Sequence, residues 1–212
     1  LGAQFALSDA GTLIYRTAGT PDLHEVVWVD RGGATTPLAP PWRFRADIDD
    51  SSVGLSPDDG RLVVSLPRGI GGGWDLWMRG VNGESPSRFT TAGIENRRPA
   101  WSRDGESLTY LHNDGQSWEV RQQRSDGVAP PTVLSTGLDR SGQGTGPREA
   151  LLSATGEWLV FRAGSTDDNT NPDIFGMRVG VDQVARPLLA EEHVEWTPAL
   201  SPDGRWLAYS SN

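Results

Sequence analysis

The sequence contains no cysteine among its 212 residues. This absence excludes a disulfide framework and thiolate chemistry, and it leaves the redox compartment open. Basic residues are also scarce, because 19 Lys and Arg stand against 28 Asp and Glu and give a net charge of −9. Nucleic-acid backbones and anionic membranes attract proteins with a basic surface, so we expect neither of them as the main partner.

Long apolar runs are absent as well. No stretch reaches the ~18 to 20 apolar residues that span a bilayer, and the first residues do not have the pattern of a signal peptide. We therefore expect no membrane insertion of this segment, and any targeting or anchoring segment would lie outside it. What the sequence has in quantity is glycine (26) and tryptophan (nine), which suits many short strands joined by tight turns.

A short pattern occurs five times along the chain, and its clearest copy is Ser-Pro-Asp-Gly-Arg-Trp-Leu-Ala-Tyr at residues 201–209. Each copy has a serine that opens a tight turn, with a large apolar residue before it and a strand-forming segment after it. The anchoring serines are Ser8, Ser56, Ser102, Ser153 and Ser201. Their spacings of 48, 46, 51 and 48 residues indicate a propeller or a similar repeat array.

The sequence of each complete repeat predicts four β-strands. The first ends at the serine, the second follows the turn, and the third begins with an acidic residue and an aliphatic one. These pairs are Glu25-Val26, Asp75-Leu76, Glu119-Val120 and Asp173-Ile174. Fourth strands are expected near residues 37–38, 88–90, 133–135 and 187–189. The turn at residues 56–60 has one residue more before its glycine and predicts a bulge or a longer turn.

The predicted fold is therefore an all-β propeller of four-stranded antiparallel blades. Four repeats are complete, and the fifth stops after its second strand, as a two-strand half blade. We expect residues 1–212 to be a single propeller domain or a fragment of one, with a fragment of a six-bladed propeller preferred over a five-bladed closure. The half blade also offers two strands for self-association with another chain.

The repeat Ser-Pro-Asp-Gly-Arg followed by the strand at residues 206–210 resembles that of TolB-type propellers, and so do the acidic-aliphatic pairs. Residues 4–38 and 198–209 resemble more narrowly the propeller attached to some bacterial membrane-anchored serine/threonine kinases. The resemblance covers essentially the whole chain and implies a sensor or scaffold region that is periplasmic or otherwise outside the cytoplasm. The chain itself has no kinase motif.

Polar segments precede several first strands and are the best candidates for a binding site. If the first strands are innermost, these segments surround one mouth of the central channel, where Arg and aromatic residues could anchor a peptide or protein partner. Hydration of the rim is the alternative. The candidate ligand-binding residues are Arg45, Asp47, Asn96, Arg97, Arg98, Arg148, Glu149, His193, Glu195 and Trp196.

Sites for metals and catalysis are less well supported. Asp167, Asn169 and Asn171 alternate as the first ligands of a calcium loop do, but Pro172 stands where glycine belongs and Arg178 where the bidentate Glu belongs. A solvated loop is the preferred interpretation of this segment. The three histidines lie in different repeats, and no Gly-x-Ser-x-Gly motif occurs. We predict no catalytic residue, no bound metal and no cofactor.

The sequence therefore predicts a non-catalytic interaction, scaffold or sensor module that binds a peptide or protein at the channel mouth. The alternative is the propeller domain of a prolyl-oligopeptidase-like peptidase, or a propeller lyase, whose catalytic part is not in this chain.

Overall fold

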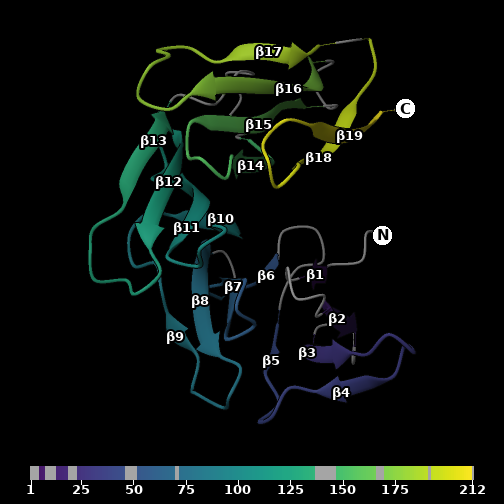
Figure 1. The fold of residues 1–212 in the computed structure, drawn as a ribbon. Coiled ribbons are helices and arrows are strands. Elements are labelled where there is room, and N and C mark those ends of the chain that lie inside the picture. The colour runs from purple at the N-terminus through teal and green to yellow at the C-terminus, as the bar shows by residue number, and fades with distance from the viewer. Residues whose placement is uncertain are drawn as a thin grey trace. The chain divides into compact units, whose positions relative to one another are not determined.

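The computed structural model describes residues 5–7, 13–18, 23–45, 52–69, 72–136, 147–165, 170–190 and 192–211. These residues form strands β1 to β19, joined by turns, and contain no helix (Figure 1). The predicted all-β fold is confirmed. A helix long and apolar enough to cross a membrane is accordingly not found in the described ranges.

Each repeat of the sequence forms its own set of consecutive strands. The first repeat forms β1 (Phe5–Leu7), β2 (Leu13–Ala18), β3 (His24–Val29) and β4 (Thr35–Pro37), in that spatial order, and the short β5 (Arg43–Phe44) also pairs with β3. The second forms β6 (Val53–Leu55), β7 (Arg61–Pro67), β8 (Trp74–Gly80) and β9 (Ser87–Arg88). The third forms β10 (Glu95–Trp101), β11 (Ser107–Asn113), β12 (Trp118–Arg124) and β13 (Thr132–Thr136).

The fourth repeat forms the antiparallel sheet β14 (Glu149–Leu152), β15 (Trp158–Ser165), β16 (Thr170–Arg178) and β17 (Arg186–Leu189). The fifth consists of two antiparallel strands, β18 (Glu195–Leu200) and β19 (Leu207–Ser211). The strands expected in each repeat are thus present in the described residues, while the number of blades in a closed propeller remains a prediction.

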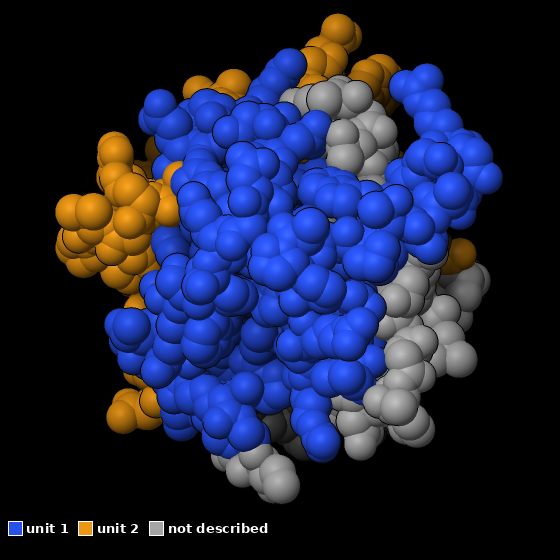
Figure 2. All heavy atoms as spheres, turned by 90° about the horizontal axis from the view of Figure 1, so that it is seen from below, with its two compact units in different colours: residues 1–108 blue, residues 109–212 orange. Residues whose placement is uncertain are grey.

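The chain divides into two compact units, Leu1–Leu108 and Thr109–Asn212, which Figure 2 colours separately. Each unit has an apolar core of its own. That of the first unit is made by Val26, Leu38, Trp42, Phe44, Leu55, Leu62 and Val64. That of the second is made by Leu111, Trp118, Val120, Ala150, Leu159, Phe161, Ala163, Phe175 and Met177. The aliphatic residue of each acidic-aliphatic pair is almost completely buried, which explains why it occurs in all four repeats that have a third strand.

The anchoring serine stabilises the turn through its side chain. The Ser201 hydroxyl accepts a hydrogen bond from the Trp206 amide at 2.9 Å and donates one to the Asp203 carboxylate at 2.6 Å. Ser102 makes the same two contacts, with the Ser107 amide and with Asp104. The recurring serine therefore serves the backbone, as its place in a tight turn predicts.

The turn that begins at Ser56 does not contain the extra residue that the sequence predicted. The Ser56 hydroxyl accepts from the Arg61 amide, five residues later, which is the spacing found for Ser102 and Ser201. The position that glycine occupies in those turns is taken by Asp59, which has a φ of 58°. Asp59 adopts the left-handed conformation itself, so the turn keeps its length and Gly60 follows it.

Candidate functional site

The candidate residues are not all within the described ranges. Asp47, Asp167 and Asn169 lie outside them, as does the side chain of Asn171, so the calcium interpretation stays untested. Arg45 is exposed directly after β5. In the described part of the chain, no group of three His, Asp or Glu side chains lies close enough together to coordinate a metal.

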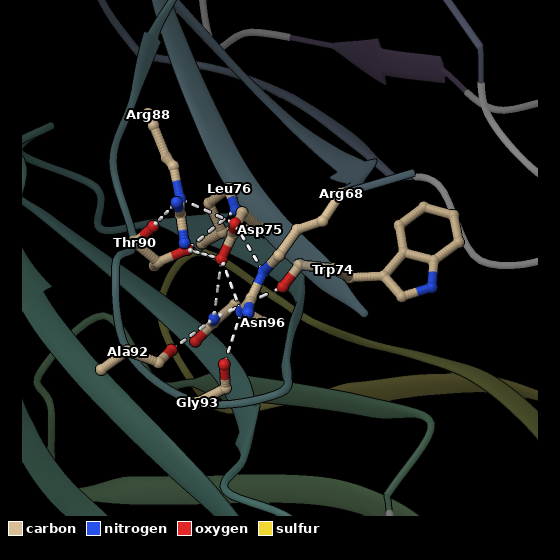
Figure 3. A network of polar contacts seen from close by, with 9 residues as sticks. All are labelled: Arg68, Trp74, Asp75, Leu76, Arg88, Thr90, Ala92, Gly93 and Asn96. Carbon is tan, nitrogen blue, oxygen red and sulfur yellow. Dashed lines mark hydrogen bonds and ion pairs between the residues drawn. The ribbon is translucent and has the colours of Figure 1, made fainter. Parts of the chain in front are cut away.

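Asn96 lies at the start of β10 and is 1% exposed. Its side-chain amide donates to the Ala92 carbonyl at 2.9 Å and to Asp75 Oδ1 at 3.3 Å (Figure 3). Asp75 belongs to the preceding repeat, on β8, and is also 1% exposed. The predicted rim residue Asn96 therefore joins two successive repeats from a buried position.

Two arginines converge on the same buried carboxylate. Arg68 Nε lies 2.8 Å and Arg88 Nε 2.7 Å from Asp75 Oδ2 (Figure 3). The Thr90 hydroxyl donates to Asp75 Oδ1 at 3.3 Å and accepts from the Leu76 amide at 2.9 Å. A buried carboxylate needs this number of donors to offset its desolvation, and the arrangement gives the acidic residue of the repeat a structural role.

Arg97 follows Asn96 and lies against Trp74 of the preceding repeat. Its guanidinium carbon is 5.3 Å from the Trp74 ring centroid, and its Nη2 is 2.8 Å from Glu95 Oε1. Trp74 is 8% exposed, so this contact is largely internal. The next residue, Arg98, has a φ of 53°, a conformation that few non-glycine residues adopt.

The equivalent position in the fifth repeat has the same backbone conformation. Thr197, which like Arg98 precedes a Pro-Ala pair, has a φ of 45°. The β18–β19 register shifts between Trp196 and Ala199, so this conformation marks a β-bulge. Bulges change the direction in which neighbouring side chains point, and the residue before Thr197 is Trp196.

Trp196 belongs to an ordered cluster of three side chains in the second unit. The Arg162 guanidinium carbon lies 4.7 Å from the Trp196 ring centroid, and Arg162 Nε lies 2.7 Å from Glu149 Oε2. Arg162 is 5% exposed, whereas Trp196 is 41% exposed. These three residues, here named the Trp196 cluster, thus combine a partly buried ion pair with an indole that is exposed to solvent.

The other candidate residues surround this cluster in sequence. The Arg148 amide donates to the Arg162 carbonyl at 3.0 Å, and its side chain is exposed. His193 is exposed as well. Glu195 is completely buried at the start of β18. Of the candidates in this unit, Glu149 and Trp196 are therefore brought together, through Arg162, which the sequence pattern did not indicate.

Arginine-tryptophan stacking occurs elsewhere in the structure, where the tryptophan is covered. Arg61 lies over Trp101 at 4.8 Å and Arg97 over Trp74 at 5.3 Å. Arg61 also donates to the Gly105 carbonyl at 2.9 Å, which joins two successive turns. Trp74 and Trp42, which lies under Arg79, are buried, and Trp101 is partly buried. Among the stacks of the described residues, only that of Arg162 on Trp196 has an exposed indole.

Comparison with known proteins supports the fold. No family model matches the chain. A protein of Bacillus subtilis (strain 168) named uncharacterized peptidase YuxL is 25% identical over 157 residues, which cover 73% of this chain and 20% of the relative. This chain therefore spans about a fifth of the length of that curated relative.

Two solved structures are similar over nearly all of the chain. TolB from Acinetobacter baumannii matches with a TM-score of 0.72 at 16% identity, covering 96% of this chain and 47% of that one. A putative TolB from Agrobacterium tumefaciens matches with a TM-score of 0.70 at 20% identity, covering 99% and 69%. The described residues thus have a TolB-like β-propeller fold, as the repeat predicted.

Proposed function

We propose that this TolB-like propeller segment is a non-catalytic interaction module, a scaffold or sensor, that binds a peptide or protein partner at the Trp196 cluster. The observation that carries the proposal is the exposure of Trp196 above a nearly buried Arg162. An indole with a fixed orientation offers a large contact area at a low cost in conformational entropy, and Trp and Arg are enriched among residues that dominate binding energies.

Contacts within the cluster hold the Trp196 indole against Arg162. Glu149 fixes the guanidinium of Arg162 through the 2.7 Å ion pair, and Arg162 in turn supports one indole. A side chain held in this way loses little freedom on binding, which favours affinity. The exposed Arg148 and His193 add hydrogen-bond donors close in sequence, so a segment that combines an apolar side chain with acceptor groups suits the surface.

The proposal can be tested with peptides of random sequence. A phage library of random dodecapeptides would be selected on the immobilised chain, and the enriched peptides would be measured by isothermal titration. We expect Trp196→Ala to weaken binding by at least about tenfold while the variant stays folded. Enriched peptides that bind Trp196→Ala as tightly as the unchanged chain would refute the site.

A propeller domain of a larger peptidase is the second candidate, and the relative named as a peptidase favours it. In that case the catalytic residues would belong to another part of the protein, and the Trp196 cluster would contact peptides on their way to that part. The two candidates differ in one result. Peptides bound by an interaction module are recovered intact after incubation with the full-length protein, whereas a peptidase cleaves them.

A further inference from the structure

Asp75 pairs with two arginines, whereas the acidic residues at the equivalent position of two other repeats each pair with one in the described structure. Glu25 Oε2 lies 3.5 Å from Arg43 Nε. Glu119 Oε2 lies 2.7 Å from Arg121 Nε. At Asp75, two guanidinium charges face one carboxylate charge, which leaves a surplus of one positive charge. The chain as a whole has a net charge of −9, so an anion that binds to it needs a local surplus of this sign.

The surplus charge lies at the surface although the carboxylate does not. Asp75 is 1% exposed, whereas the side chains of Arg68 and Arg88 are 29% and 38% exposed. In Figure 3 the carboxylate lies between the two guanidinium groups. Its oxygens also accept hydrogen bonds from Thr90 and Asn96, so they cannot occupy all the N–H groups of both arginines. Guanidinium N–H groups therefore remain for an acceptor that approaches from the solvent.

Backbone contacts hold Arg68 in place. Its Nη2 donates to the Gly93 carbonyl, and its amide donates to the Gly73 carbonyl at 2.9 Å. The segment that contains Gly93 is itself fixed, because the Trp74 amide donates to the Ile94 carbonyl at 3.0 Å. A Cβ atom on Gly73 would lie 1.9 Å from the Ile94 carbonyl oxygen, so the two segments are in direct contact here. A guanidinium held in this way loses little conformational freedom when it binds a ligand.

The size of the surplus and an apolar neighbour indicate which anion fits. A phosphate monoester carries a charge of about −1.5 to −2 at pH 7, which exceeds the surplus of one, whereas a single carboxylate matches it. The nearby pair of Glu95 and Arg97 adds no net charge. Ile94, which directly follows Gly93, is 50% exposed and offers an apolar contact beside the arginines. An acidic side chain next to an apolar one therefore suits this surface.

We infer that Arg68 and Arg88 form a second binding site, which takes an acidic segment of another polypeptide. The guanidinium groups bind a carboxylate of that segment, and an apolar side chain beside the carboxylate contacts Ile94. Charge-assisted hydrogen bonds from a fixed fork of donors supply both affinity and orientation. The site belongs to the first unit and shares no residue with the Trp196 cluster. The inference goes beyond the proposed function and does not depend on it.

The probe is the peptide Gly-Ser-Asp-Leu-Asp-Leu-Gly-Ser, labelled with tetramethylrhodamine. Its fluorescence anisotropy would be followed while the chain is added. In the control peptide both Asp are replaced by Asn, which keeps the shape and removes the charge. We expect saturable binding of the acidic peptide and binding at least about tenfold weaker for the control. Raising the ionic strength from about 0.02 M to about 0.3 M should weaken binding of the acidic peptide, because salt screens partly exposed charges.

Two variants of the chain locate the binding. Arg88→Gln leaves Asp75 with a single arginine, as in the other two repeats, so we expect a folded variant that binds the acidic peptide at least about tenfold more weakly. Arg186→Gln is the matched control. It removes one of two arginines that share Asp182, but those side chains are 49% and 64% exposed, and the carboxylate between them is not fully buried. We expect this control to bind as the unchanged chain does.

Two further variants complete the test. Ile94→Glu places a negative charge beside the arginines and should also weaken binding, so it replaces Arg88→Gln if circular dichroism shows that variant to be unfolded. Trp196→Ala should leave binding of this peptide unchanged. Equal binding of both peptides, unchanged binding by the site variant, or an equal loss in Arg186→Gln would overturn the inference. So would no binding up to about 5 mM, or a loss in Trp196→Ala, since the peptide would then occupy the Trp196 cluster.

Discussion

Glu149 and Arg162 form an ion pair at two repeat positions that serines occupy in the second repeat. The Glu149–Arg162 distance is 2.7 Å, and the equivalent hydroxyls of Ser52 and Ser65 lie 3.0 Å apart. The fifth repeat has a third version of the pair, in which the hydroxyls of Thr197 and Ser210 lie 3.2 Å apart. The charged version is thus a local replacement in the fourth repeat, and it is the one that places a cation against Trp196.

This replacement predicts a non-additive effect on stability. Glu149→Ser removes the acidic partner of a nearly buried arginine, and we expect it to lower the free energy of unfolding by about 3 kcal/mol. The double variant Glu149→Ser/Arg162→Ser restores the arrangement of the second repeat and should be more stable than Glu149→Ser alone. Urea denaturation measures both. A double variant whose loss equals the sum of the two single losses would contradict the expectation.

The buried carboxylate of Asp75 predicts a large loss when its charge is removed. Asp75→Asn removes the negative charge that pairs with Arg68 and Arg88, and we expect a loss of about 3 to 5 kcal/mol in the free energy of unfolding. Asn96→Ala removes one neutral donor and should cost about 1 to 2 kcal/mol. Asp126→Asn is the matched control, because Asp126 pairs with Arg124 on the surface, and its effect should be much smaller. Similar losses for Asp75→Asn and Asp126→Asn would refute this account of the cluster.

Asp59 predicts a stabilising substitution. Its φ of 58° is the conformation that glycine has at the equivalent Gly105, Gly156 and Gly204. We expect Asp59→Gly to raise the free energy of unfolding by about 0.5 to 1 kcal/mol, and the β-branched Asp59→Val to lower it by about 1 to 2 kcal/mol. Thermal and urea unfolding give both values, and the opposite order would be incompatible with the backbone conformation described.

The serine-aspartate contacts of the turns predict an acid-dependent loss of stability. The pKa values of Asp58, Asp104 and Asp203 are lowered, first by the hydroxyl of the anchoring serine and then by a backbone amide. A pKa lower in the folded state than in the unfolded state means that the carboxylate form stabilises the fold. This contribution is present above the unfolded pKa of about 3.9 and is lost as the pH falls through the folded pKa.

The corresponding measurement compares melting temperatures between about pH 7 and pH 2.5. The chain with all three residues changed to Asn should lose less of its melting temperature on acidification than the unchanged chain, because these three side chains no longer titrate. The turn at Ser153 has Thr155 at the position of these three aspartates and therefore contributes no such titration. Parallel melting curves for the two proteins across the range would contradict the sign of the effect.

The strands and turns could be predicted because their signals are local. In the turns at Ser56, Ser102 and Ser201, the serine, the aspartate and the positive-φ residue lie within six residues of sequence, and only Asp59 in place of glycine led to a wrong turn length. The Trp196 cluster depends on contacts between distant segments. Glu149 and Arg162 are neighbours through the register of β14 and β15, and Trp196 comes from the next repeat. Sequence therefore indicated Glu149 and Trp196 but not Arg162.

The buried position of Asn96 could not be predicted from the sequence either. Its position before a first strand placed it among the predicted rim residues, yet Asp75, 21 residues earlier, draws its amide into a buried network. A signal was present, since an acidic residue recurs in every third strand and a buried acid requires donors. Which residues supply those donors depends on packing between repeats, which the sequence does not specify.

If Trp196 binds a partner because Arg162 holds its indole in place, the two exposed tryptophans of the fifth repeat should differ in their effect on binding. Trp196 is 41% and Trp206 69% exposed, and both lie in the fifth repeat, but only Trp196 stacks on an arginine in the described structure. Isothermal titration of a library-selected peptide would be carried out with Trp196→Ala and Trp206→Ala. We expect a loss of at least about tenfold in affinity for Trp196→Ala and little change for Trp206→Ala. Equal affinities of the two variants would contradict it.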